Sequence, residues 1–240
     1  KIFKKIKQVQ IIACGTSYNA GIVAKYWLED IAKIPCSVEV ASEYRYRNPI
    51  LIEGTLFITL SQSGETADTI EALKTVLKNK NKIYSLCITN SPESSISRIS
   101  DLTFLTHAGP EIGVASTKAF TTQLVALALL TCSIGSLKKT VTTTQEKDIV
   151  TGLKKLPGLI NEALLQENQI KKLASSFKNK KSALFLGRGT MHAIALEGAL
   201  KLKEISYIHA EAFPAGELKH GPIALIDNNM PVIAIAPNDE

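Results

Sequence analysis

Residues 55–78 read TLFITLSQSGETADTIEALKTVLK, and this stretch decides the fold. Its first six residues are almost uniformly apolar, which is typical of a strand buried on both faces. Its second half carries apolar residues at helical spacing and predicts an amphipathic helix. A strand, a short hydroxyl-rich turn and a helix in direct succession form the unit from which parallel α/β sheets are built.

The same alternation continues through the first part of the chain. Other strand-like runs lie at 8–14, 35–41, 83–89 and 101–106, and helical patterns follow the first run and the last. Short apolar strands separated by amphipathic helices predict a parallel sheet that is covered on both faces. We therefore expect residues 1–140 to form one doubly wound α/β domain, a flavodoxin-like three-layer sandwich.

A second, weaker copy of this pattern follows. The segment 141–177 has helical character without a strand and predicts a helical connector. Residues 182–206, SALFLGRGTMHAIALEGALKLKEIS, then repeat the strand, turn and helix of residues 10–32. We therefore expect a second parallel-sheet domain in tandem at 178–240. Since it stops after its third strand-like segment, we expect it to be truncated and to need further sequence or another chain to complete its sheet.

Composition limits the possible functions. The 240 residues are 45% hydrophobic and 21% charged, with a net charge of +6. The basic residues are scattered, without zinc-finger spacing or a stripe interleaved with aromatics, so we expect no nucleic-acid partner. Four cysteines without metal-ligand spacing, together with the lack of a signal peptide, predict a reduced, cytoplasmic protein. The most apolar run, 119–137, contains polar residues and predicts a helix buried in a core or subunit interface, not a membrane span.

The turn Ser61–Thr66, SQSGET, is the sharpest functional signal. It joins a buried strand to a helix, and open parallel sheets bind ligands at the carboxyl ends of their strands. The start of a helix offers unpaired N–H groups and a positive dipole end, to which Ser61, Ser63 and Thr66 add hydroxyl donors. Gly64 lets the backbone approach a ligand closely. The turn therefore predicts a phosphate site, with a simple helix cap as the alternative.

Two further turns favour the phosphate interpretation. Cys14–Ser17, CGTS, and Val114–Phe120, VASTKAF, also open helices with hydroxyl residues, and the second of these helices is expected from Ser116 onward. Three such helix starts on one sheet predict a single crevice for one ligand. Since the sequence has no GxxxxGK[ST] motif, we expect a small phosphorylated molecule and not a nucleoside triphosphate.

The second part of the chain supplies groups for acid–base chemistry. Glu197, Lys201 and Glu204 are spaced at i, i+4 and i+7, so they share one face of the predicted helix. The alternative is a ladder of solvent-facing ion pairs. Against it, the helix opens directly from the turn at 187–189, and its core face is accounted for by Leu196, Ala199, Leu200 and Ile205. The following GELKHGP places His220 in a flexible loop, a position typical of catalytic residues.

The chain is similar to the isomerase domains of the glutamine–fructose-6-phosphate aminotransferase family, which consist of two sugar isomerase (SIS) domains in tandem. The resemblance covers nearly all 240 residues, and its last motif distinguishes this family from other sugar isomerase domains. It is carried by CGTSYNAG from Cys14, ASEYRYR from Ala41, LSQSGETADT from Leu60, EIGVASTKAFTTQL from Glu111, LGRG from Leu186 and ALEGALKLKEISYIHAEAFPAGELKHGP from Ala195.

The resemblance implies a function and a set of site residues. It implies conversion of fructose 6-phosphate and ammonia to glucosamine 6-phosphate by ketose–aldose isomerisation, in hexosamine biosynthesis, without a metal or cofactor. Glu204 is implied as the base that moves a proton between C1 and C2, with Lys201 close to the sugar. His220 is implied to open the sugar ring from a neighbouring subunit of a homodimer. The implied substrate contacts are Thr16, Ser17, Ser61, Gln62, Ser63 and Thr66 at the phosphate and nearby hydroxyls, and Val114, Ala115 and Ser116 along the sugar.

Two parts of that family's enzymes are not found in the sequence. They are the glutaminase domain, which supplies ammonia, and a C-terminal tail whose lysine forms an imine with the sugar. We therefore expect the 240-residue chain to bind substrate and to turn it over poorly. Two alternatives stay open: another aldose–ketose isomerase of the same fold, disfavoured by GELKHGP and EYRYR, and a non-catalytic sugar-phosphate sensor, disfavoured by Glu204.

Overall fold

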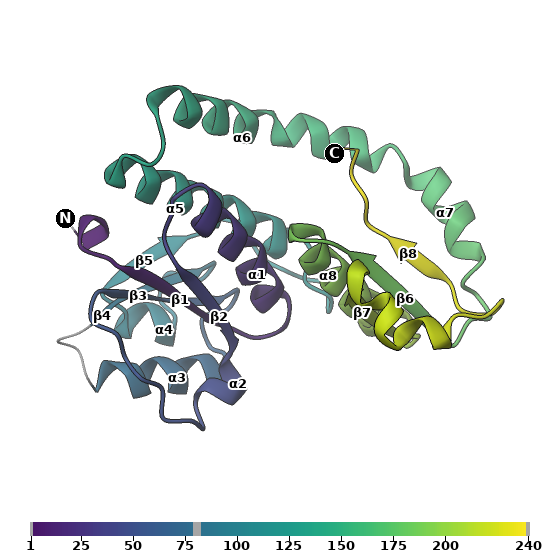
Figure 1. Cartoon of the computed structure of the whole chain (residues 1–240), viewed down its shortest axis with the longest axis horizontal. Helices are drawn as coiled ribbons and strands as arrows, with labels where there is room; N and C mark the ends of the chain where they lie inside the picture. The colour runs from purple at the N-terminus through teal and green to yellow at the C-terminus, as the bar shows by residue number, and fades with distance from the viewer. Residues whose placement is uncertain (1, 79–82, 239–240) are drawn as a thin grey trace. The chain divides into compact units, whose positions relative to one another are not determined.

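A five-stranded parallel sheet in the order β2-β1-β3-β4-β5 forms the centre of the first of two units (Figure 1). The structure is a computed structural model that describes residues 2–78 and 83–238, and the units comprise Lys1–Thr143 and Thr144–Glu240. The sheet order is that of a flavodoxin-like doubly wound fold, so the predicted fold class is confirmed. The strands are β1 (Gln8–Ala13), β2 (Cys36–Val40), β3 (Thr55–Ser61), β4 (Ile83–Thr89) and β5 (Leu102–Leu105).

Helices cover both faces of this sheet because successive strand residues point to opposite sides. Ile11 and Ile58 belong to a core with α1 and α5, whereas Ile12 and Phe57 belong to a core with α2, α3 and α4 (Figure 1). All residues of β3 are buried, as the apolar run of this central strand predicted. The helices of the unit are η1 (Ile2–Lys4), α1 (Gly15–Asp30), α2 (Ala41–Tyr44), α3 (Ala67–Leu77), α4 (Ser95–Ile99) and α5 (Lys118–Lys138).

The apolar helix α5 belongs in part to the first core. Among the described residues, α5 is the one helix long and apolar enough to cross a membrane, a property that core helices of soluble proteins share. Its residues Ala126, Leu127, Leu130 and Ile134 pack in the core that α1 covers. This packing agrees with the prediction of a core helix.

The second unit repeats the strand arrangement at the start of the first. Its sheet has the order β7-β6-β8 with parallel pairing throughout, so the first strand in sequence lies between the next two, as in β2-β1-β3. The internal duplication seen in the sequence therefore has a counterpart in topology. The elements are β6 (Ser182–Gly187), α8 (Thr190–Ser206), β7 (His209–Pro214), η3 (Ala215–His220), η4 (Pro222–Leu225) and β8 (Val232–Ala234).

The core of the second unit is small and consists mainly of alanine. Ala183, Ala195, Ala199 and Ala210 surround Phe185. A Cβ on Gly198 would lie 2.9 Å from the Phe185 ring, so this glycine permits the close approach of α8 to β6.

Two helices with no buried side chain precede this sheet. They are α6 (Thr143–Leu164), which contains Pro157, and α7 (Glu167–Ser175). Both lie where the helical connector is predicted. The two compact units of the structure divide after Thr143. The domain boundaries predicted at residues 140 and 177 stay a prediction.

Two glycines with positive φ form the strand-to-helix turns after β1 and β3. Gly15 has φ +53° and no atom within 4 Å of where a Cβ would stand. Gly64 has φ +67°, and a Cβ there would overlap the side chain of Ser94. The same backbone strain therefore applies to any substitution at either position, while steric overlap applies at Gly64 alone.

We expect Gly64→Ala to destabilise the first unit more than Gly15→Ala. Each substitution adds left-handed strain of about 1–2 kcal/mol, and overpacking against Ser94 adds about 1–3 kcal/mol at Gly64. Denaturant unfolding of the two variants and the parent, compared at constant m, measures the difference. Equal losses for both variants would contradict the packing described for Gly64.

Candidate functional site

The hydroxyls of the SQSGET turn are ordered by hydrogen bonds within the turn. The Oγ of Ser61 and the Oγ1 of Thr66 lie 2.9 Å apart, and the N–H of Gly64 donates to Ser61 Oγ at 3.0 Å. The N–H of Glu65 donates to Ser63 Oγ at 3.1 Å. Thr66 is the N-cap residue of α3, yet its side chain makes no cap hydrogen bond. The alternative of a simple helix cap is therefore weakened, because the hydroxyl of Thr66 does not satisfy the helix start.

The turn is also held from outside by the residues that follow β4. The N–H of Asn90 donates to the carbonyl of Gln62 at 3.0 Å, and the N–H of Ile96 donates to that of Gly64 at 3.1 Å. These bonds fix the backbone of the turn at the carboxyl end of β3. The first N–H groups of α3 have no partner within the helix, as at every helix start.

The CGTS turn lies beside the SQSGET turn at the same sheet edge. In the parallel pairing of β1 with β3, Ala13 is opposite Leu60, so both strands end together. Ser17, in the first turn of α1, is buried and accepts a hydrogen bond of 3.0 Å from Nε2 of Gln123 on α5. Thr16 is the partly exposed neighbour of Ser17 in that turn.

Gln123 is a residue that the sequence interpretation did not assign. It is 2% exposed, and its Oε1 has no hydrogen-bond partner among the described residues. The sequence feature that could have pointed to Gln123 is a single amide side chain at the start of the apolar stretch that follows VASTKAF. Its partner Ser17 lies 106 positions away, so the contact follows from packing of α5 on α1.

The VAST segment is placed differently from the other two turns. Helix α5 begins at Lys118 and not at Ser116, so the predicted start is wrong by two residues. Val114 is 99% exposed, and Ala115 and Ser116 are partly buried. Glu111 holds the helix start instead, accepting from the N–H of Ala119 at 3.1 Å. A shared crevice with the SQSGET turn stays a prediction for these three residues.

An open cavity of about 630 Å³ adjoins the SQSGET turn on its β4 side. Gln62 and Ser63 line it together with Asn90 and His107, from the segments after β4 and β5. Asn90 orders the far wall: its Oδ1 accepts from the N–H of Ala108 at 2.8 Å, and its Nδ2 donates to Gly109 at 2.7 Å. No local pattern pointed to Asn90, because its partners Ala108 and Gly109 lie in the segment after the next strand.

In the second unit, the predicted charged face of α8 is a connected cluster. The ammonium of Lys201 lies 3.5 Å from Glu197 Oε1 and also contacts Glu204 Oε2. The side chain of Glu197 is 8% exposed and that of Glu204 is 34% exposed. A ladder of fully exposed ion pairs is therefore excluded for this face. Ile205, expected on the core face, is exposed, because small alanines make the contact with β6.

The GELKHGP segment is more regular than predicted. It forms the 3₁₀ helices η3 and η4, with Gly221 between them at φ +131°. His220 is exposed at the end of η3. Its contribution to ring opening, from this or a neighbouring subunit, stays a prediction.

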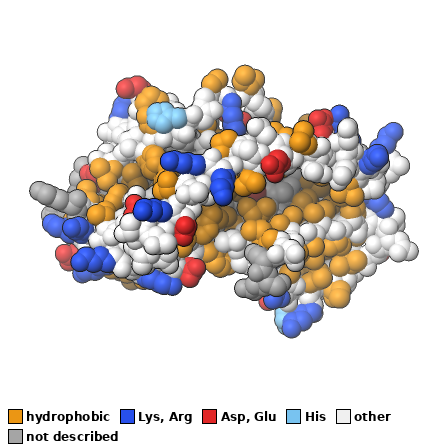
Figure 2. Space-filling view, turned by 90° about the horizontal axis from the view of Figure 1, so that it is seen from above, with side chains coloured by type: hydrophobic (Ala, Val, Ile, Leu, Met, Phe, Trp, Pro, Cys, Tyr) orange, Lys and Arg blue, Asp and Glu red, His pale blue; other side chains and the backbone are white. Residues whose placement is uncertain are grey.

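Basic side chains form no continuous stripe on the face seen in Figure 2. Lys and Arg are interspersed there with apolar and neutral polar groups. This distribution matches the scatter of lysines along the sequence.

Comparisons with known proteins assign the family. A family model for the SIS domain matches residues 2–133 and 176–240. Glutamine–fructose-6-phosphate aminotransferases (isomerizing) of Francisella tularensis and Pseudomonas syringae are 56% and 59% identical over 240 residues. Each match covers all of this chain and 39% of the relative, so the chain spans about two fifths of these relatives' length.

Solved structures show the same relationship. The C-terminal domain of glucosamine-fructose-6-phosphate aminotransferase from Francisella tularensis superposes with a TM-score of 0.97 at 56% identity, covering 100% of this chain and 67% of that one. A putative phosphosugar isomerase from Silicibacter pomeroyi gives a TM-score of 0.83 at 26% identity, covering 99% and 69%. The chain therefore belongs to the SIS-domain family and corresponds to the C-terminal isomerase region of glutamine–fructose-6-phosphate aminotransferases.

Proposed function

We propose that this chain binds fructose 6-phosphate and isomerises it, with ammonia, to glucosamine 6-phosphate. The observation that carries the proposal is the SQSGET turn at the junction of β3 and α3, where ordered hydroxyls surround a helix start that its N-cap residue, Thr66, does not cap with its side chain. Identity of 56–59% to isomerizing aminotransferases over the whole chain supports it. A glutaminase domain as ammonia source, a homodimer and a cytoplasmic location are further proposals that rest on the resemblance.

We assign binding of the phosphate group to the first unit. A helix start favours an anion through its free N–H groups and its dipole, and hydroxyls add donors without a fixed positive charge. Ser61 and Thr66 are within hydrogen-bond distance of each other, so one ligand oxygen can approach both. Gln62 and Ser63 face the adjoining cavity of about 630 Å³, which has room for a hexose phosphate. These features support phosphate recognition without a metal ion.

The second unit is assigned the proton transfer. The isomerisation removes a proton from C1 and returns one to C2, and a single carboxylate on one face of the intermediate can do both. Glu204 is more accessible than Glu197, whose buried carboxylate is paired with Lys201. Glu197 is therefore assigned to holding Lys201, and Glu204 to the reaction. Removing Glu197 would take one of the two carboxylates from the ammonium of Lys201 and leave the other, Glu204, to balance its charge.

Replacing both Ser63 and Thr66 by Ala should weaken binding of fructose 6-phosphate. Each charge-assisted hydrogen bond that is lost accounts for about 1.5–3 kcal/mol. Isothermal titration calorimetry measures the loss. The matched control is Thr75→Ala on α3, whose hydroxyl donates to the carbonyl of Glu71. Unchanged affinity of the double variant would place the phosphate elsewhere.

A thermal-shift panel tests the choice of substrate in the parent. Fructose 6-phosphate and glucosamine 6-phosphate should stabilise it, and arabinose 5-phosphate and free fructose should not.

Glu204→Gln should leave fructose 6-phosphate binding intact and slow proton transfer. The amide keeps the shape of the side chain and removes its basicity, so solvent deuterium exchange at C1 should fall by roughly 10²–10⁴. The full-length enzyme is used for the measurement, with Glu197→Gln as the comparison. Exchange that survives Glu204→Gln and is lost in Glu197→Gln would transfer the role of base to Glu197.

A further inference from the structure

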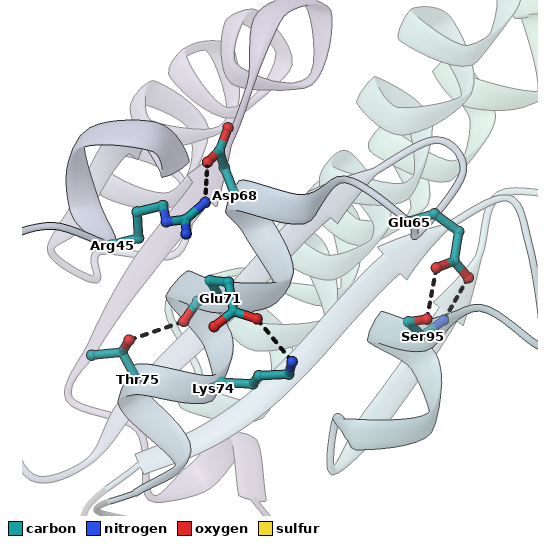
Figure 3. Close-up of polar contacts among 7 residues, drawn as sticks. All are labelled: Arg45, Glu65, Asp68, Glu71, Lys74, Thr75 and Ser95. Carbon is teal, nitrogen blue, oxygen red and sulfur yellow. Dashed lines mark hydrogen bonds and ion pairs between the residues drawn. The ribbon is translucent and has the colours of Figure 1, made fainter.

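Three carboxylates lie in or just after the turn that is assigned the phosphate, and each has a partner. Glu65 accepts from the N–H and Oγ of Ser95 at 2.8 and 2.6 Å (Figure 3). The hydrogen bonds from Ser95 lower the pKa of Glu65, so it is an anion at neutral pH. Asp68 pairs with Arg45 at 2.7 Å, and Glu71 pairs with Lys74 at 2.8 Å (Figure 3).

Asp68 is the carboxylate that lies on the first turn of α3 itself, the segment whose free N–H groups and dipole attract a phosphate. An unpaired carboxylate there would compete with a phosphate for the same dipole and repel it. Glu71 lies a turn further on and pairs within its own helix, so it affects the helix start less.

Arg45 reaches Asp68 from another element of the same sheet edge. It follows α2, directly after β2, and its guanidinium donates from Nη1 to Asp68 Oδ1. The guanidinium also lies over the ring of Tyr46 at 4.8 Å, and both members of the ion pair are partly buried. The second arginine of the ASEYRYR motif behaves differently, since Arg47 pairs with Glu39 at 2.6 Å.

We propose that Arg45 is a positioning residue of the phosphate site: by pairing with Asp68 it cancels the negative charge at the start of α3 that would otherwise repel the ligand. The inference rests on the proposed function, because it assigns the phosphate to the SQSGET turn. Arg45 acts through Asp68 and does not itself touch the phosphate. It gives the ASEYRYR motif a role in ligand binding that the hydroxyl residues alone do not reveal.

The charge on Asp68 makes the proposal testable by compensation. Arg45→Met should weaken fructose 6-phosphate binding on the order of 5-fold at low salt, and the loss should shrink at high salt. Asp68→Asn should bind at least as tightly as the parent, because it removes the repelling charge. The double variant Arg45→Met/Asp68→Asn should recover affinity toward that of the parent. Calorimetry with fructose 6-phosphate at two salt concentrations measures all three.

Arg47→Met is the matched control, because it removes the same charge two residues away without touching α3. It should leave affinity unchanged, and circular dichroism should show each variant folded. A double variant as weak as Arg45→Met would indicate that Arg45 only supports local structure and would overturn the proposal, as would an Arg47→Met loss of equal size. If the parent itself fails to bind fructose 6-phosphate, the proposed function fails first and the role of Arg45 falls with it.

Discussion

The parallel pairing of β1 with β3 is the constraint on which the candidate site depends. Because both strands run in the same direction, with Ala13 opposite Leu60, their carboxyl ends meet at one edge. The chain then leaves the sheet in opposite directions, since α1 packs on one face and α3 on the other. The two hydroxyl-rich turns flank the point where the direction of strand order changes, where open α/β sheets bind their ligands. A shift of one residue in this register would turn the side chains of one strand to the opposite face, so that Ile11 and Ile58 would no longer lie in the same core.

The two units carry different kinds of polar chemistry. The first presents hydroxyls and backbone N–H groups, and the carboxylates around its helix start are bound to partners outside the turn. The second presents a lysine between two carboxylates on a helix that packs through alanines. The hydroxyl and N–H donors suit the anion of the proposed function, and the charged cluster suits its proposed proton transfer. The small alanine core follows from the close approach of α8 to β6.

The periodicity of the sequence was sufficient to predict the strands of the sheet. It was not sufficient to predict the contacts that orient the site residues. The strand runs at 55–60 and 83–89 match β3 and β4 within one residue, because buried central strands have an unbroken apolar pattern. The four- and five-residue helices α2 and α4 are too short to leave a periodic signal. Local motifs also located the hydroxyls of SQSGET and the charged face of α8.

The partners that orient these groups come from distant segments. Gln123 reaches Ser17 across 106 positions, and Arg45 reaches Asp68 across 23. No local pattern encodes such a contact, since it depends on how helices pack on the sheet. The VAST segment shows the same limit: the helix begins two residues after the predicted start, and Glu111, not a hydroxyl, accepts the N–H of Ala119 there.

The direction of the hydrogen bonds in the turns has a consequence for ligand chemistry. The oxygens of Ser17, Ser61 and Ser63 each accept an N–H from the protein, from Gln123, Gly64 and Glu65. An oxygen engaged in this way still has its own hydrogen to donate, although the hydroxyls of Ser61 and Thr66 use one of their two hydrogens in the bond between them. Counted by protons, these turns therefore hold a surplus of O–H hydrogens and need atoms that only accept. A fully deprotonated phosphate meets this need at every oxygen, whereas an amide or an ammonium group, which brings hydrogens of its own, does not.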